Sequence, residues 1–539
     1  MSFRCLAVGL AFWALPLVTA LPVPSAPFRS GAEVTTEQWQ PFDLVFSAPT
    51  GAGHPFDVEF SAAFTGPAGE KLIIPGFFDG PGRTVLRFAP PRAGRWTFTT
   101  ASAVPGLNQL SGAIRATAAG PGRHGPLGID PKNPRQFAHA DGTPSFPIAF
   151  EADWLFALDA ENPAGIPKTV SLVRHIAANG FNQVVMNVYA YDVTWPRDHQ
   201  LDPAHDYGRP RIFPFGGDNT NPDFSTLNVA FFQHLDRVIA HLDQRGLIAH
   251  LMIYVWNKQV SWPAARSAED NRYFDYIVKR YQAFPNMLWD VSKEATGYGR
   301  NDMPYIAERA ARLRALDAGR RLVTVHDYGY CSRYPDTVDF ISIQTWASEL
   351  WHVMMDVRAK HPTKPILNIE HGGYERGPIH VFTGSYLDPE VCLERAYQIV
   401  FAGAFPTHYW QDTSWNVVIH DPSVLPEADR PRLHYYRHLA TLAARYGFTG
   451  LEPEPRRSNN GFCLSNQRDL FVYLVPRETS AFVVRPPKEA KGTLHATWFD
   501  PFSGASRMET PRPIGSDLFF TPPAPGRMAV LIVRLAPGP

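Results

Sequence analysis

Two glutamates, Glu294 and Glu370, each end a short apolar run, in the stretches LWDVSKE and PILNIE. Two carboxyl groups held about 5 Å apart can act on an anomeric carbon, one as nucleophile and the other first as acid and then as base. This chemistry needs unequal pKa values, which burial and the proximity of like charges produce. Because the two residues are far apart in the chain, the fold must bring them together.

The segment that carries both glutamates has the pattern of parallel βα units. Short apolar runs alternate with amphipathic helical stretches between residues 146 and 448. The predicted strands are residues 146–154, 181–191, 247–256, 287–294, 322–328, 339–346, 365–373 and 407–413. Eight strands with intervening helices predict an α/β fold, a (β/α)8 TIM barrel over residues 121–450.

The flanking segments have a different pattern. Short runs of period two, separated by Gly and Pro turns, predict an N-terminal immunoglobulin-like β-sandwich over residues 31–120 and a C-terminal β-sandwich over residues 459–539. Residues 1–20 contain Arg4, an apolar stretch and the small-residue sequence VTA. They predict a signal peptide cleaved before Leu21, hence a secreted or periplasmic protein, with an uncleaved membrane anchor as the alternative.

Composition narrows the range of partners. The 539 residues contain 51 Lys plus Arg and 51 Asp plus Glu, so no net charge would attract nucleic acid or an anionic membrane. Removal of the signal peptide leaves Cys331, Cys392 and Cys463, which form no disulfide framework, although one pair could bridge. Neither ligand spacing for a metal nor a Gly-rich phosphate loop is found, so no metal or cofactor is expected. The oligomeric state is left open.

Polar and aromatic residues gather at the predicted strand ends, where TIM barrels place their chemistry. Aromatic faces pack on sugar rings, and acids and amides bind hydroxyls, so a carbohydrate substrate is expected. The predicted substrate-binding residues are Asp153, Trp154, Asn187, Tyr189, Trp256, His326, Tyr328, Trp346, Trp410 and Asp412. For Trp346 and Trp410 a place in the core is the alternative, Asp290 is expected to be structural, and Glu375 is a rival nucleophile.

Strand alternation predicts which side chains point into the barrel. If Glu294 points inward, Ser292 and Asp290 do too, and Lys293 faces the helices. By the same count Glu370 shares a face with Asn368. The alternative is an inward Lys293, whose ammonium would lie within reach of Glu294 and lower its pKa, or would bind an acidic or heavily hydroxylated sugar.

The two glutamates resemble the catalytic pair of clan A glycoside hydrolases, in which the acid/base follows strand four and the nucleophile ends strand seven. The stretches PGFFDGPGRTVLRFAPPRAGRWTF, GPLGIDPKNPRQFAHADGTPSFPIAFEADW, LFVYLVPRETSAFVV and ATWFDPFSG resemble the secreted apiosidase-like glycosidases with a collagen-binding C-terminal domain. The resemblance covers nearly the whole chain after the signal peptide. It implies that Glu294 is the acid/base and Glu370 the nucleophile of a retaining mechanism. Clan A enzymes commonly have Asn before the acid/base, and here that place is taken by Lys293.

These observations predict a secreted glycoside hydrolase that cleaves a poly- or oligosaccharide with retention of the anomeric configuration. The alternative is a non-catalytic glycan-binding or cell-surface interaction protein built on the same scaffold. A polysaccharide lyase is a third reading, which the neutral charge does not favour.

Overall fold

The computed structural model describes residues 22–47, 53–194, 202–298, 302–376, 385–485, 493–510, 512–514 and 517–536, so the predicted signal peptide lies outside the described residues. Its centre is a sheet of eight parallel strands in the order β19-β18-β17-β14-β13-β24-β21-β20. The strands are β13 (Ala149–Glu151), β14 (Gln183–Asn187), β17 (Ile248–Val255), β18 (Met287–Lys293), β19 (Val323–His326), β20 (Ile341–Gln344), β21 (Ile366–Glu370) and β24 (Phe405–His408). Strands β19 and β20, at the two ends of this order, are also in contact, which confirms the predicted barrel.

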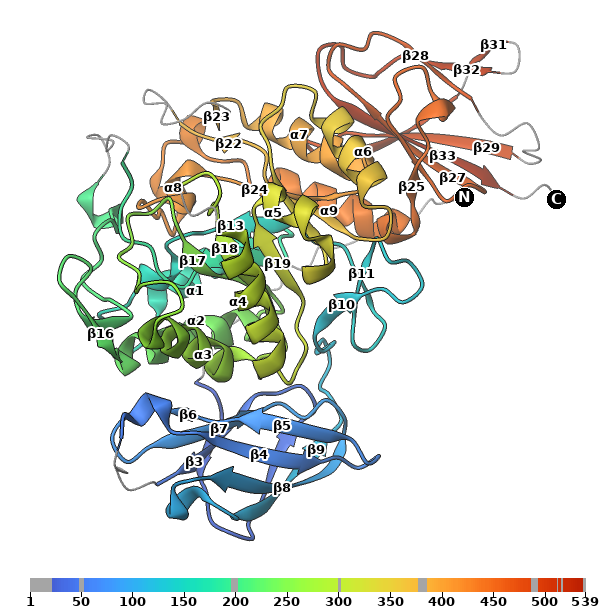
Figure 1. Ribbon diagram of the computed structural model, residues 1–539. Coiled ribbons are helices and arrows are strands. Elements are labelled where there is room, and N and C mark those ends of the chain that lie inside the picture. Colours follow the sequence, from blue (N-terminus) through green and yellow to red (C-terminus); the bar gives the residue numbers. More distant parts are fainter. Residues whose placement is uncertain are drawn as a thin grey trace, which may run out of the picture.

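Helices cover the outside of the barrel (Figure 1). They are α1 (Pro167–Ala178), α2 (Val229–Gln244), α3 (Ala268–Tyr281), α4 (Met303–Leu316), α5 (Tyr328–Arg333), α6 (Leu350–Lys360), α7 (Pro389–Phe401), α8 (Gln411–Ser414) and α9 (His434–Tyr446). Local sequence fixes several starts, since Asn228 and Ser267 cap α2 and α3 by accepting backbone N–H bonds. All residues of β17 and β18 are buried, as expected for strands with helices on one side and a packed interior on the other.

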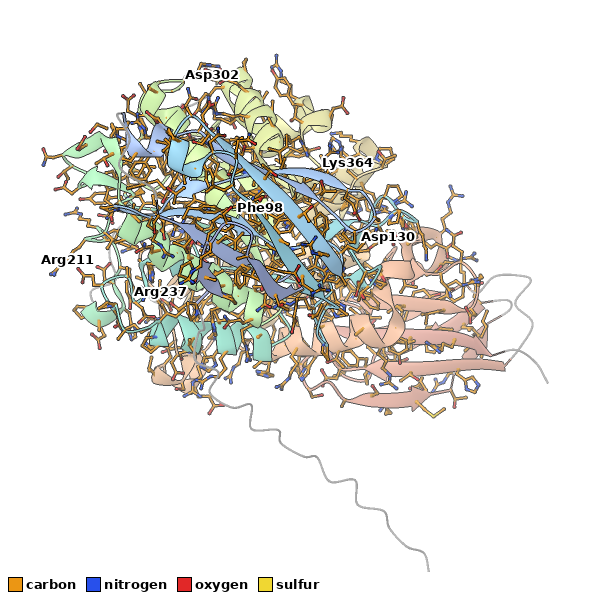
Figure 2. The ribbon with its side chains drawn as sticks, turned by 90° about the horizontal axis from the view of Figure 1, so that it is seen from below. Phe98, Asp130, Arg211, Arg237, Asp302 and Lys364 are labelled. Atoms are coloured by element: carbon orange, nitrogen blue, oxygen red, sulfur yellow. The ribbon has the colours of Figure 1, made fainter. Side chains whose placement is uncertain are left out.

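The N-terminal strands form two sheets below the barrel (Figure 1). One contains β1 (Ser25–Pro27), β3 (Phe42–Phe46), β7 (Thr84–Phe88) and β6 (Phe77–Phe78); the other contains β2 (Glu33–Glu37), β9 (Ser111–Thr117), β8 (Gly94–Ser102), β4 (Phe60–Thr65) and β5 (Lys71–Pro75). Residues from both sheets, among them Leu44, Phe64 and Phe98, share one core. Figure 2, seen from below, shows these strands in front of the barrel, with Phe98 labelled among them. The arrangement is the predicted sandwich.

A small sheet closes the end of the barrel at which the strands begin. It contains β10 (Leu127–Ile129), β11 (Phe137–His139) and β12 (Pro144–Ser145). Leu127 and Phe137 pack with residues at the starts of the barrel strands, such as Ala149 and Phe405. Because this end is filled by apolar side chains, the opposite end is left for a site.

The C-terminal strands form two further antiparallel sheets beside α6 and α7 (Figure 1). One contains β25 (Glu452–Pro453), β26 (Cys463–Ser465), β27 (Leu470–Val475), β33 (Ala529–Ala536), β29 (Thr493–Phe499) and β30 (Ser506–Glu509); the other contains β28 (Phe482–Val484), β32 (Asp517–Phe520) and β31 (Arg512–Ile514). Arg477 pairs with Glu394 of α7 at 2.8 Å, and Phe462 packs against Trp351 of α6. The two sheets share a core, as predicted for a second sandwich.

Two short strand pairs complete the described strands. β15 (Phe215–Gly217) and β16 (Pro222–Leu227) are antiparallel, and β22 (Gly373–Tyr374) and β23 (Ser385–Tyr386) are parallel. Cys331, Cys392 and Cys463 are buried free thiols, so none of these three pairs with another. Among the described helices none combines the length and the apolar character needed to cross a membrane.

Candidate active site

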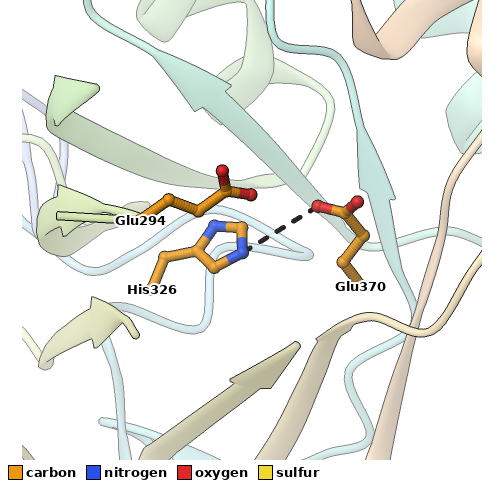
Figure 3. A group of neighbouring side chains, drawn as sticks. All are labelled: Glu294, His326 and Glu370. Atoms are coloured by element: carbon orange, nitrogen blue, oxygen red, sulfur yellow. Dashed lines mark ion pairs between the residues drawn. The ribbon is translucent and has the colours of Figure 1, made fainter. Parts of the chain in front are cut away.

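Glu294 and Glu370 meet at the carboxyl end of the barrel. Glu294 directly follows β18, Glu370 is the last residue of β21, and His326 ends β19 between them (Figure 3). One side-chain N or O atom of each of the three residues lies within 4.8 Å of the others. The two carboxyl groups are therefore close enough to act on the same atom of a substrate.

The pair faces a cavity of about 370 Å³, a size within the usual range for small-molecule sites. Its walls are polar near the glutamates and aromatic elsewhere. It is lined by Val193, Thr194, Asn257, Lys258, Lys293, Glu294, Thr296, Gly297, Tyr298, His326, Asp327, Tyr328, Gln344, Trp346, Glu370 and Trp415. Five predicted site residues are in this set: Glu294, Glu370, His326, Tyr328 and Trp346.

Strand alternation fails at the top of both glutamate strands. The pairing of β18 with β19 shifts between Asp290 and Lys293, and that of β20 with β21 skips Ile369, so that Gln344 lies opposite Glu370. Such bulges re-aim side chains and are common beside active sites. The prediction that Glu370 shares a face with Asn368 is wrong, because Asn368 contacts Met354 of α6 while Leu367 and Ile369 fill the barrel interior.

The same irregularity overturns the expected outward position of Lys293. Its side chain is 1% exposed, and its Nζ donates to Glu151 Oε1 at 2.7 Å and to Asp153 Oδ2 at 3.1 Å. The ammonium also lies 3.9 Å from Glu370 Oε2. Lys293 therefore belongs to the floor of the cavity and not to the barrel exterior.

Glu294 has a backbone conformation that its residue type rarely adopts. Its φ is +57°, in the left-handed region, where a side chain with a Cβ is strained. Strain of this kind persists only where the surroundings impose it, and it clusters at functional sites. Gln344 Nε2 donates to Glu294 Oε1 at 2.9 Å and fixes the orientation of the carboxyl group.

Burial and neighbouring charges set the protonation of the site. Burial raises the pKa of Glu370 to about 7, although Lys293 opposes the shift and Glu294 adds to it. Burial also disfavours the charged form of Lys293, but Asp153, Glu151 and Glu370 outweigh it and hold the lysine pKa well above its usual value. Burial and the Lys293 charge hold the pKa of His326 far below its usual value, so the imidazole is neutral. The centre thus combines a charged lysine with a Glu370 carboxyl group whose pKa lies near neutral pH.

Three predicted binding residues are core side chains that do not line the cavity. Trp154 and Trp410 are 0% exposed, and Tyr189 is packed against Phe156 and Phe213. Burial of these rings stabilises the barrel and leaves no ring face for a sugar.

Four other predicted residues are also absent from the cavity lining. Asp153 is buried beneath it, bonded to Lys293 and 3.3 Å from Lys258. Trp256 donates to Ser292 Oγ at 2.7 Å and lines a neighbouring cavity of about 180 Å³. Asn187 is fully buried, and Asp412 accepts from Arg376 at 2.8 Å. Of these four, Asp153 supports the floor of the cavity directly, through its contacts with the two lysines that line it.

The two weighed alternatives, Asp290 and Glu375, also lie outside the cavity lining. Asp290 Oδ1 accepts from the backbone N–H of Ser292 and of His326, and its Oδ2 is 3.1 Å from His250 Nε2. These bonds support the structural role expected of Asp290. Glu375 is buried at 2% exposure.

The sequence reasoning missed Lys258, Tyr298 and Trp415, which line the cavity from loops beyond the strand ends. Lys258 Nζ lies 5.0 Å from the centre of the Trp415 ring, within cation–π distance. Lys258 follows the strand-end pair Trp256-Asn257 by one residue, which is the only signal that could have found it.

Glu294, His326 and Glu370 are also, among the described residues, the group whose donor atoms are close enough to share a cation. N–H donors already engage both carboxylates, since Gln344 bonds Glu294 and the Lys293 ammonium faces Glu370. A cation would have to displace this fixed positive charge, so the donor set suits acid–base chemistry better.

Comparisons with known proteins agree with this architecture. A candidate glycoside hydrolase from Bacteroides vulgatus ATCC 8482 has a structure similar to that of this chain, with 21% identity, a TM-score of 0.76 and coverage of 94% of this chain and 100% of its own. A glycoside hydrolase family 5 protein from the same organism matches at 17% identity and a TM-score of 0.57, covering 77% of this chain and 94% of its own. A further glycoside hydrolase matches at 16% identity and a TM-score of 0.58, covering 78% of this chain and 99% of its own. At these identities the likeness shows the shared fold.

Sequence comparisons define the family. A search of curated proteins finds no match. Residues 35–103 match a domain of unknown function (DUF5060). Residues 131–436, more than half of the chain and the whole of the barrel strands, match the family described as "Apiosidase-like, catalytic domain". This chain belongs to the Apiosidase-like catalytic domain family.

Proposed function

We propose that this protein is a glycoside hydrolase that cleaves a glycosidic bond of an oligo- or polysaccharide with retention of anomeric configuration. The observation that carries the proposal is the distance between Glu294 and Glu370, whose oxygens come within 4.8 Å at the mouth of the barrel. Retaining enzymes place their carboxyl groups about 5 Å apart, whereas inverting enzymes leave about 6.5–9.5 Å for a water molecule. Family membership and the glycoside hydrolases with the same fold support the proposal.

The surroundings of the two carboxyl groups support a different role for each. Glu370, beside the Lys293 ammonium, is suited to attack the anomeric carbon as a carboxylate. Glu294 is held by Gln344 across the cavity, where it can protonate the departing oxygen and then deprotonate the water that releases the sugar. Trp346, Tyr298 and Trp415 offer aromatic faces to the sugar rings.

The experiment is hydrolysis of a panel of plant and bacterial glycans by the wild-type protein and by Glu294→Gln and Glu370→Gln. Each variant is expected to reduce kcat/KM by roughly a thousandfold or more, because both carboxyls are needed for the two-step displacement. Glu478→Gln, an exposed residue of the C-terminal sheets, is the matched control. Near-normal activity in either active-site variant rejects the pair.

The first-formed anomer separates retention from inversion. NMR during early turnover is expected to show product with the configuration of the substrate. Inverted product would contradict the role of Glu370 as nucleophile while leaving hydrolysis intact. If the protein binds a glycan of the panel but hydrolyses none of them, the non-catalytic alternative is favoured.

Export is the remaining part of the proposal, and it rests on residues 1–20 of the sequence. N-terminal sequencing of protein recovered outside the cytoplasm is expected to begin near Leu21. Recovery of full-length chain in the membrane fraction would instead indicate an uncleaved anchor.

A further inference from the structure

The buried ammonium of Lys293 is the feature of the site that the two-carboxylate chemistry leaves unexplained. An isolated charge in a protein interior is strongly unfavourable, so a buried lysine needs charged partners. On one side of Lys293 the partners are Glu151, the last residue of β13, at 2.7 Å and Asp153, two residues later, at 3.1 Å. These contacts fix the ammonium between β13 and the Glu370 carboxylate.

The clamp is rigid because each member is packed. Glu151 and Asp153 are 0% exposed, and Lys258 adds a second ammonium 3.3 Å from Asp153. Lys293 is also the last residue of β18, so its Cα is held by the barrel sheet. The contact with Glu370 is longer, at 3.9 Å. At this distance the ammonium acts on the carboxyl group through its charge and forms no hydrogen bond with it.

We propose that Lys293 is a positioning residue that keeps the Glu370 carboxylate ionised and aimed at the substrate. The inference rests on the proposed function, because it assigns Lys293 a part in the nucleophilic step. It also explains why a lysine can replace the amide expected before the acid/base: the β18 bulge turns the residue toward the nucleophile.

Several charged or titratable groups face Glu370, and their effects oppose one another. They are Lys293 and Glu294 from β18 and its end, Tyr298 from the following loop, His326 from β19, Lys258 after β17, Glu151 and Asp153 from β13 and its end, and Tyr409 after β24. His326 is neutral, and the other carboxyls disfavour ionisation of Glu370. Lys293 is therefore the nearest group that favours the carboxylate. An opposite charge at this distance lowers a carboxyl pKa by roughly 1 to 3.

The test compares Lys293→Met with Lys293→Arg and with Lys360→Met, which removes an exposed lysine of α6. The first readout is the pH profile of kcat/KM on nitrophenyl glycosides, whose leaving group needs little acid help. Lys293→Met is expected to move the acidic limb upward by one pH unit or more, so that kcat/KM one unit below the wild-type limb falls by roughly tenfold and recovers toward high pH. Lys293→Arg and Lys360→Met are expected to keep the wild-type limb.

The second readout does not depend on turnover. The infrared difference between each protein and its Glu370→Gln derivative isolates the carboxyl band of Glu370, which is then followed against pH. A higher pKa of Glu370 in Lys293→Met than in the wild type supports the inference, even if no glycoside is hydrolysed. Failure of the proposed function and failure of this inference are therefore distinguishable. An unchanged Glu370 titration, or an equal shift in Lys293→Arg, overturns it.

Loss of Lys293 leaves buried acids unpaired, and Lys293→Met can fail to fold for that reason. In that case the double variant Glu151→Gln/Lys293→Met replaces Lys293→Met, because it removes both charges of the closest ion pair. It is compared with the single variant Glu151→Gln. The same upward shift of the Glu370 titration is expected between these two proteins, and its absence counts against the inference.

Discussion

At the scale of single residues, the protonation of Glu370 governs when the proposed chemistry runs. Its pKa is raised to about 7, chiefly by burial. A nucleophile must be ionised, so the competent fraction falls as pH drops through this value. We expect kcat/KM to decline about tenfold per pH unit below about 7, and a pH–rate profile on a soluble substrate measures it.

The same pH profile also tests which groups cause the decline of kcat/KM on its acidic limb. Because the two carboxyls interact, the limb belongs to the pair, and Glu294→Gln is expected to move it downward by removing the like charge. A limb that remained near the ordinary carboxyl value in the wild type would contradict the burial of Glu370. Activated aryl glycosides are the substrate for this measurement, because their leaving group needs little help from an acid.

Residue identity predicted that Glu294 and Glu370 meet at one end of the barrel, but not how the residues around them are oriented. The glutamates could be found because acids at strand ends are unusual in an apolar pattern. The inward position of Lys293 could not be found, because it depends on the bulge between Asp290 and Lys293, which alternation cannot reveal. The left-handed backbone at Glu294 likewise has no sequence signal, since glycine is the residue that marks such positions.

At the scale of elements, seven of the eight barrel strands lie within the apolar runs that predicted them, whereas β24 ends at His408 and residues 411–413 of the predicted eighth strand belong to α8. Period and length suffice for this, since each buried strand is a continuous apolar run. Aromatic residues at the strand ends are a different matter. Trp346 lines the cavity and is 38% exposed, whereas Trp410 is 0% exposed, and both are tryptophans near the end of a strand. Which ring meets solvent depends on how the following loop packs.

This difference predicts opposite outcomes for two tryptophan substitutions. Trp346→Ala is expected to weaken substrate use, with kcat/KM falling roughly two- to tenfold for a loss of about 0.5–1.5 kcal/mol of ring contact, and to leave the unfolding midpoint nearly unchanged. Trp410→Ala is expected to reduce the free energy of unfolding by about 3–5 kcal/mol, because it opens a cavity in the core. Steady-state kinetics and chemical denaturation of both variants provide the comparison. A stability loss in Trp346→Ala equal to that of Trp410→Ala would show that Trp346 is a core residue.

At the scale of the whole molecule, the cavity lining comes from the barrel segment, residues 193–415, and none of the lining residues belongs to the described terminal sheets. The N-terminal sandwich is joined to the barrel by buried charges. Arg87 of β7 bonds Asp43 of β3 at 2.7 Å and Asp236 of α2 at 2.9 Å. Arg280 of α3 bonds the same Asp236 at 2.6 Å and reaches back to Asp79 at 2.9 Å. Both guanidiniums also lie over the Phe77 ring. Arginines and carboxylates thus alternate across the domain boundary.

The network predicts that the sandwich stabilises the barrel from a distance without tuning its chemistry. Arg87→Met removes a side chain that is 2% exposed and leaves Asp43 and Asp236 short of a partner, which is expected to cost about 3–5 kcal/mol of unfolding free energy. Arg95→Met is the matched control, since Arg95 pairs with Glu33 on the exposed face of the same sandwich, where such pairs contribute little. Denaturant unfolding measures both, and the pH profile of kcat/KM is expected to be the same in the two variants and the wild type, because neither arginine lines the cavity. A displaced pH limb in folded Arg87→Met would instead mean that the buried charges at the domain boundary reach the carboxyl pair, and the sandwich would then belong to the catalytic unit.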